Sequence, residues 1–257
     1  MFAVGSLAVN DLAAVAVVAV WCFVVSVLGT SVGLILGSIR LPVLLLFSSS
    51  PAAGAGANVG ISAVAAATAA TTHVRRGTVD WKLAAWMTPA SIVGAIIGGL
   101  ASGRLPGDAL LVVIGIVLVY FGATGLIRRK PSTATVSRHP ARAAAAWGLG
   151  IGVLGGLVGL ILGTLRIPAL VRHLGVSAYR AVATNLVVGF WLGVAGVVGH
   201  LSDGVDWELF AVGAAASIPG AMIGSRLTGR LSERQLLDAI GVVLVVVGVV
   251  TAARGIL

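Results

Sequence analysis

Eight long apolar runs restrict this chain to a membrane architecture. They lie near residues 12–28, 55–72, 83–101, 109–127, 143–158, 181–199, 208–225 and 235–253. A helix needs roughly 20 apolar residues to cross the ~30 Å hydrocarbon core of a bilayer. In lipid, every backbone polar group must find its hydrogen bond inside the protein, so each run is expected to be a helix. The sequence therefore predicts an all-α fold, a polytopic transmembrane helical bundle.

Composition excludes several other classes of protein. Hydrophobic residues make up 58% of the 257 residues and charged residues only 10%, so the exterior is expected to face lipid. The net charge of +9 is concentrated in loops, where Lys and Arg orient membrane proteins, and we expect no nucleic-acid partner. The single cysteine, Cys22, excludes an internal disulfide and is expected to be a small buried hydrophobe.

Signs of catalysis are weak in this sequence. It contains no H-E-x-x-H and no P-loop, and no Asp or Glu lies in the middle of an apolar run. We therefore expect no enzyme, no cofactor and no metal site. The missing carboxylates also argue against a proton relay within the membrane, which leaves the coupling mechanism open.

The chain consists of two similar halves, whose matching segments are 126 residues apart. The pairs are GLILGSIRLP at 33–42 with GLILGTLRIP at 159–168, VDWKL at 79–83 with VDWEL at 205–209, and SIVGAIIG at 91–98 with SIPGAMIG at 217–224. The last pair contains GxxxG, which lets helix backbones approach closely. We predict a first transmembrane repeat at 1–127, a basic cytoplasmic connector at 128–142 and a second transmembrane repeat at 143–257.

Loop charges favour inverted repeats. The connector and the loop with Arg75 and Arg76 are basic and expected to be cytoplasmic, whereas the equivalent loop of the second half carries Asp203 and Asp206. Four full crossings in each half would instead make the repeats parallel. Inversion therefore requires each Gly-Pro segment to add a re-entrant turn or an extra crossing.

Each repeated ten-residue segment is expected to break a helix at the opening of its half. In the first, Gly33, Gly37 and Pro42 disfavour a continuous helix, because Gly costs about 1 kcal/mol and Pro about 3 kcal/mol relative to Ala. Freed backbone groups in a membrane must be buried in protein or line a wet cavity. We therefore predict two irregular segments in the interior, with half-helix N-termini directed at a bound anion.

Arg40 and Arg166 supply positive charge at equivalent positions of the two segments. An arginine at membrane depth costs at least ~2.5 kcal/mol, so its repetition favours a functional role. The planar guanidinium of arginine can donate to two oxygens of a carboxylate or a sulfur oxyanion at once. The alternative is that both side chains reach the headgroup interface as anchors. Asn58 and Asn185 either donate to the same anion or only join helices.

These arguments predict a substrate site between the two repeats. Its residues are Arg40, Arg166, Asn58, Asn185, Gly37, Gly163, Ser38, Thr164, Pro42 and Pro168.

Two further repeated pairs are assigned structural roles. Asp80 and Asp206, each followed by Trp, are expected to cap helix N-termini beside the membrane interface. His73 and His200 are expected to lie at a membrane edge.

The chain resembles the TauE/SafE sulfite-exporter permeases over nearly its whole length. A Gly-rich stretch closing in Pro opens each half, and HVRRGTVDW at 73–81 and HLSDGVDW at 200–207 are similar to the loop signature of that family. The family usually shows a run of consecutive glycines and a small apolar residue where this chain has Gly37, Ser38 and Arg40, and in the second half Gly163, Thr164 and Arg166. The resemblance implies a multi-pass protein of the bacterial cytoplasmic (inner) membrane that transports sulfite-type anions, often outwards.

From these features we expect a secondary carrier or facilitated permease for small anions such as sulfite, other sulfur oxyanions or organosulfonates. Its partners are then the small anionic substrate and the lipid bilayer, and assembly into a homo-oligomer is left open. An anion channel and a non-transporting structural membrane protein remain as alternatives.

Overall fold

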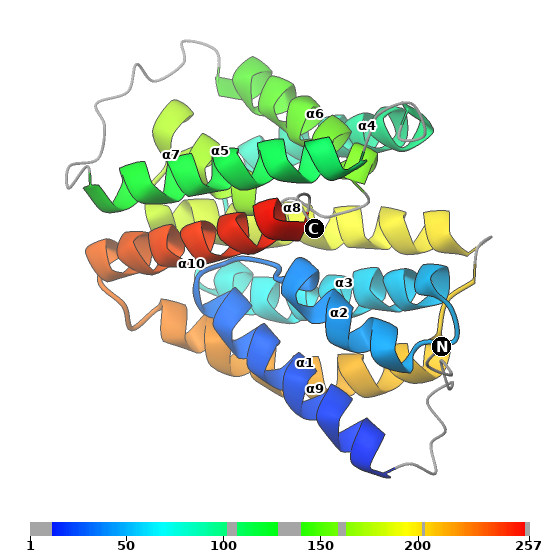
Figure 1. Cartoon of the computed structure of the whole chain (residues 1–257). Coiled ribbons are helices and arrows are strands. Elements are labelled where there is room, and N and C mark those ends of the chain that lie inside the picture. Colours follow the sequence, from blue (N-terminus) through cyan, green and yellow to red (C-terminus); the bar gives the residue numbers. More distant parts are fainter. Residues whose placement is uncertain (1–11, 102–106, 128–139, 159–162, 202–203, 255–257) are drawn as a thin grey trace. The chain divides into compact units, whose positions relative to one another are not determined.

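The computed structural model describes residues 12–101, 107–127, 140–158, 163–201 and 204–254, and the described residues form ten helices and no strand (Figure 1). The helices are α1 (Leu12–Ser31), α2 (Gly37–Phe47), α3 (Pro51–Arg75), α4 (Trp81–Ala101), α5 (Gly107–Ile127), α6 (Pro140–Val158), α7 (Gly163–His173), α8 (Ala178–His200), α9 (Trp207–Thr228) and α10 (Glu233–Arg254). The predicted all-α class is confirmed.

Each of the eight apolar runs lies in one of the eight long helices. Five stretches within the described residues are long and apolar enough to cross a membrane: Leu12–Ser31, Ala53–Arg75, Ala178–His200, Trp207–Thr228 and Arg234–Ala253. The two additional helices, α2 and α7, have 11 residues each. At 1.5 Å per residue, such a helix covers only about half of the hydrocarbon core.

The exposed stripe of α1 shows why the exterior must be apolar. Val17, Val20, Val24 and Leu28 follow one another at helical spacing and are all exposed, whereas Cys22 on the same helix is buried. A row of large apolar side chains is costly in water and favourable against lipid tails. The helix therefore presents one stripe to the bilayer and another to the protein, as expected of a multi-pass membrane protein.

The chain divides into two compact units that do not coincide with the predicted repeats. One unit comprises Met1–Gly77 with Gly189–Thr228, and the other comprises Thr78–Val188 with Gly229–Leu257. Each unit thus takes helices from both halves of the sequence. The repeat boundaries stay a prediction about the sequence, and of the connector at 128–142 only its last three residues are described, which form the start of α6.

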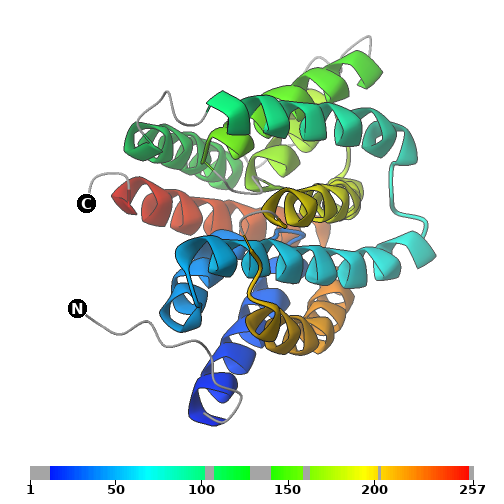
Figure 2. The ribbon, with the colours of Figure 1, turned by 90° about the vertical axis from the view of Figure 1, so that its right-hand side faces the viewer.

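In the first unit, α9 packs along α1 and α3 (Figure 2). Two glycines of α9 allow the close approach to α1. A Cβ atom on Gly220 would lie 2.6 Å from the carbonyl oxygen of Phe23, and one on Gly224 would lie 2.4 Å from that of Val27. The packing role predicted for the GxxxG of α9 is confirmed.

In the second unit, α4 packs along α6, and α5 packs along α10. A Cβ atom on Gly94 of α4 would lie 2.3 Å from the carbonyl oxygen of Leu149, and one on Gly152 of α6 would lie 2.3 Å from that of Ser91. Backbone contact replaces side-chain contact here, as in membrane helix pairs built on small residues.

The core of the first unit joins α1, α2, α3 and α9. Its fully buried apolar cluster includes the only cysteine of the chain, and this confirms the prediction for that residue. The cluster consists of Val18, Cys22, Leu44, Ala57, Ile61 and Leu209.

Candidate functional site

The predicted helix break in the first half is present, but proline does not make it. Gly33 has φ of +71°, which glycine adopts without steric cost, and it lies between the end of α1 and the start of α2. Pro42 instead lies inside α2. The expectation that Pro42 helps to break the helix was wrong, because proline's fixed φ is itself helical and costs a short helix only local hydrogen bonding.

The second half has the same sequence of elements around its arginine. Helix α6 ends at Val158 and α7 begins at Gly163, and the predicted break lies outside the described residues. Pro168 is again inside the short helix rather than at its boundary, and it is buried.

Arg40 is buried within the first unit, at 2% relative exposure. Its Nε donates to Oδ1 of Asn58 over 3.0 Å, and its Nη2 donates to Oγ of Ser62 over 2.6 Å. Asn58 in turn donates from Nδ2 to the carbonyl oxygen of Gly37 over 3.1 Å. Asn58 and Ser62 are one turn apart on α3 and so lie on one face, which holds the guanidinium against that helix.

Arg166 occupies a related setting within the second unit and has 0% relative exposure. Its Nη1 donates to Oδ1 of Asn185 over 2.8 Å. The amide of Asn185 also lies against Gly163, where an added Cβ would be 3.2 Å from Nδ2. The Nε and Nη2 atoms of Arg166 are buried and have no hydrogen-bond partner.

The remaining predicted site residues lie on the same short helices as the arginines. Ser38 and Pro42 are half-buried on α2, whereas Thr164 and Pro168 are buried on α7. The structure thus groups the ten residues into two clusters, one in each compact unit.

Both guanidinium groups are buried among neutral partners. Among the described residues, every hydrogen bond that we find from Arg40 or Arg166 ends on an amide or a hydroxyl oxygen. A buried charge without a counter-charge is costly, typically by several kcal/mol. Their burial also weighs against the alternative of headgroup anchors, because anchoring requires the guanidinium to reach water or lipid phosphate. Both clusters are therefore suited to receive an anion.

Sequence reasoning missed Ser62, which accepts from Arg40. The available signal was its spacing of four residues from Asn58 within an apolar helix.

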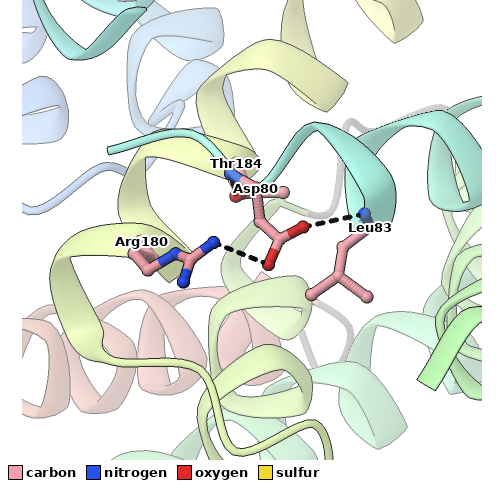
Figure 3. A network of polar contacts seen from close by, with 4 residues as sticks. All are labelled: Asp80, Leu83, Arg180 and Thr184. Carbon is pink, nitrogen blue, oxygen red and sulfur yellow. Dashed lines mark hydrogen bonds and ion pairs between the residues drawn. The ribbon is translucent and has the colours of Figure 1, made fainter. Parts of the chain in front are cut away.

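Asp80 caps α4, as predicted, and makes contacts that the sequence did not suggest (Figure 3). Its Oδ1 accepts from the backbone N–H of Leu83 over 3.1 Å, and its Oδ2 pairs with Nη2 of Arg180 over 3.1 Å. Its backbone N–H donates to Oγ1 of Thr184 over 3.0 Å. The carboxylate therefore ties the start of α4 to the first turns of α8.

Asp206 plays the matching part in the first unit. Its Oδ1 accepts from the backbone N–H of Leu209 over 3.1 Å, which confirms the predicted cap of α9. Its Oδ2 accepts from the backbone N–H of Ser49 over 3.1 Å, and its own N–H donates to the carbonyl oxygen of Ala53 over 3.2 Å. These bonds fix the turn between α2 and α3. They therefore also fix the C-terminal end of α2, the helix that carries Arg40.

Residues 29–33, GTSVG, match the G-x-S-x-G pattern of serine hydrolases. In that pattern the serine stands on a sharp turn between a strand and a helix. Here Ser31 ends α1 and its Oγ donates to the carbonyl oxygen of Leu28 over 2.8 Å. Ser31 therefore does not stand on the turn between a strand and a helix that a serine nucleophile of this pattern requires.

A pocket of about 360 Å³ lies in the first unit, between α3, the second half of α8 and the start of α9. Its lining is almost entirely apolar, with side chains such as Val64, Phe190, Val197 and Phe210. A pocket without a charged side chain offers an anion no compensation for its lost hydration. The arginine clusters therefore remain the candidate sites.

Comparison with known proteins gives one family and several relatives. The model of the family described as Sulfite exporter TauE/SafE matches residues 18–251. The "Probable membrane transporter protein MamO" of Magnetospirillum gryphiswaldense is 36% identical over 115 residues, which cover 42% of this chain and 18% of that protein. The "Probable membrane transporter protein YunE" of Bacillus subtilis is 22% identical over 246 residues, covering 85% of this chain and 89% of that protein. The chain thus matches less than a fifth of MamO but most of YunE. No solved structure matches.

Proposed function

This chain belongs to the sulfite exporter TauE/SafE family, and from that membership we propose that it is a transporter of small anions in the bacterial cytoplasmic membrane. The observation that carries the anionic part of the proposal is the burial of Arg40 and Arg166 among neutral partners. A bound anion supplies the missing counter-charge.

Sulfur oxyanions and organosulfonates fit these clusters by their chemistry. Each carries several oxygens on one atom, and a guanidinium donates to two such oxygens at once. The N-termini of α2 and α7 add partial positive charge, since each arginine is the fourth residue of its short helix. Relatives named as probable membrane transporters are consistent with this assignment.

The transport mode that we propose is a secondary carrier or facilitated permease. No Asp or Glu lies in the middle of a predicted span, which argues against a carboxylate relay of protons and leaves the coupling ion open. The anion would leave its cluster when the protein changes conformation.

Uptake of radiolabelled sulfite into liposomes containing the purified protein tests the proposal. We expect saturable uptake that Arg40→Gln and Arg166→Gln each weaken about ten- to a hundredfold in apparent affinity, because each removes a positive charge whose interaction with the bound anion is worth ~1.5–3 kcal/mol.

Arg180→Gln is the matched control. Its side chain is 54% exposed and pairs with Asp80 at the surface, so its loss should leave uptake within about twofold of wild type. Uptake no faster than in protein-free liposomes would refute transport of this anion, and flux that does not saturate would instead indicate a channel.

A further inference from the structure

We infer that the two arginine clusters are not equivalent and that Arg166 is the residue that binds the anion. It binds through the two adjacent donors Nε and Nη2, which together form the fork of the guanidinium. The ligand class that follows is an anion with at least two oxygens on one atom. This inference rests on the proposed function and deepens it.

A guanidinium offers two donors side by side along the edge that contains Nε and Nη2. In Arg166 both of these atoms are buried and have no hydrogen-bond partner, while Nη1 on the other side is held by Asn185. Burying two unpaired donors of a charged group is costly unless a ligand completes them. The hydrogen bond to Asn185 fixes the guanidinium and leaves the fork open in the sense that both of its donors are unpaired.

The same edge of Arg40 is already occupied. Asn58 accepts from Nε and Ser62 accepts from Nη2, so that fork is closed by two oxygens of the protein itself. An oxyanion could use this edge only by displacing both partners. Arg40 therefore contributes positive charge from a fixed position, and its fork does not bind two oxygens of the ligand.

The sequence contains the reason for the difference. Ser62 follows Asn58 by four residues, and the residue that follows Asn185 by four is Gly189. Glycine has no side chain to accept from an arginine. The second half thus lacks the hydroxyl that closes the fork in the first half.

The open fork discriminates between anions by their shape. Sulfite, a sulfonate or a carboxylate places two oxygens opposite Nε and Nη2 and receives two nearly parallel charge-assisted hydrogen bonds. A monatomic anion such as bromide feels the same charge but cannot accept in this paired geometry. Lysine at the same position would keep the charge and lose the fork.

Calorimetric titration of the purified protein with sulfite and with bromide tests this inference. We expect wild-type protein to bind sulfite at least about tenfold more tightly than bromide. Arg166→Lys should lower sulfite affinity about tenfold or more and change bromide affinity less than about threefold. Arg40→Lys should leave the ratio of the two affinities within about threefold of wild type.

An unchanged ratio in Arg166→Lys, or an equal loss in Arg40→Lys, would overturn the inference while leaving the proposed function intact. Should Arg166→Lys fail to yield folded protein, equal affinity of wild-type protein for sulfite and bromide would still overturn the inference, because it is incompatible with a working fork. Wild-type protein that binds neither anion and takes up neither into liposomes would refute the proposed function as well.

Discussion

Arg40 and Arg166 are the residues whose placement is hardest to explain by folding alone. Each is among the largest fully buried side chains of the described residues, and each bonds to an asparagine of the helix that follows its own. Replacing a buried charged group by a well-packed apolar one often stabilises a protein. Keeping arginine at both positions therefore points to a use for the charge.

A double-mutant cycle tests whether the charges of Arg40 and Arg166 act on one bound anion. Arg40→Gln and Arg166→Gln should each weaken sulfite affinity about ten- to a hundredfold. If one anion interacts with both charges, the double variant loses less than the sum of the two free-energy changes, because groups that share a ligand are not independent. Binding isotherms of the four proteins measure the difference, and strict additivity would assign the two clusters to separate anions.

A second residue-scale prediction concerns Asp80, whose two carboxylate oxygens have different partners. Asp80→Ala removes the cap of α4 and the ion pair with Arg180, and should cost about 0.5–2 kcal/mol of stability. Arg180→Ala removes only the ion pair, which is partly exposed, and should cost at most about 1 kcal/mol. Thermal unfolding of both variants in detergent compares them. A larger loss in Arg180→Ala would show that the ion pair, and not the cap, holds α4.

At the scale of elements, helix pairing in this protein depends on glycines that meet a backbone. The pairs α1 with α9 and α4 with α6 both use them, each pair joining helices from different halves of the sequence. Without a hydrophobic driving force between helices in lipid, close packing supplies most of the association energy. A methyl group at the contact should therefore be enough to separate such a pair.

Two glycines of α6 provide a matched test of this packing. A Cβ on Gly152 would meet the carbonyl oxygen of Ser91, whereas one on Gly150 would meet nothing within 4 Å. Gly152→Ala should lower the unfolding temperature, because backbone cannot move aside as a flexible side chain can. Gly150→Ala should be neutral or stabilise by up to about 1 kcal/mol through helix propensity. Equal unfolding temperatures for the two variants would contradict the packing role of Gly152.

At the scale of the whole molecule, the repeat itself makes a prediction about topology. Lys82 and Glu208 are exposed and are separated by the repeat distance of 126 residues. If the repeats are inverted, Lys82→Cys should be labelled by a membrane-impermeant maleimide only after the cells are permeabilised. Glu208→Cys should be labelled in intact cells. The native Cys22 is buried and should not be labelled in either variant. Labelling of both positions from the same side would establish parallel repeats.

Much of the fold could be predicted because the membrane restricts it strongly. Long apolar runs must become helices in lipid, and all eight did. The two short helices were expected only as breaks. Gly33, with its positive φ, lies in the break between α1 and α2. Because proline prefers a helical φ, α2 can include Pro42.

The sequence by itself determined the helical class, the close-packing glycines, the two caps and the identity of Arg40 and Arg166, since each depends on local chemistry or on the repeat. Only the tertiary structure decided which helices pair. It also decided that the two arginines are buried without a carboxylate partner among the described residues. In Arg40 the Nε and Nη2 donors are paired with Asn58 and Ser62, whereas in Arg166 the same two donors are unpaired. The physical reason is that a hydrogen bond depends on the position and direction of two groups far apart in the chain, and these follow from how the helices pack.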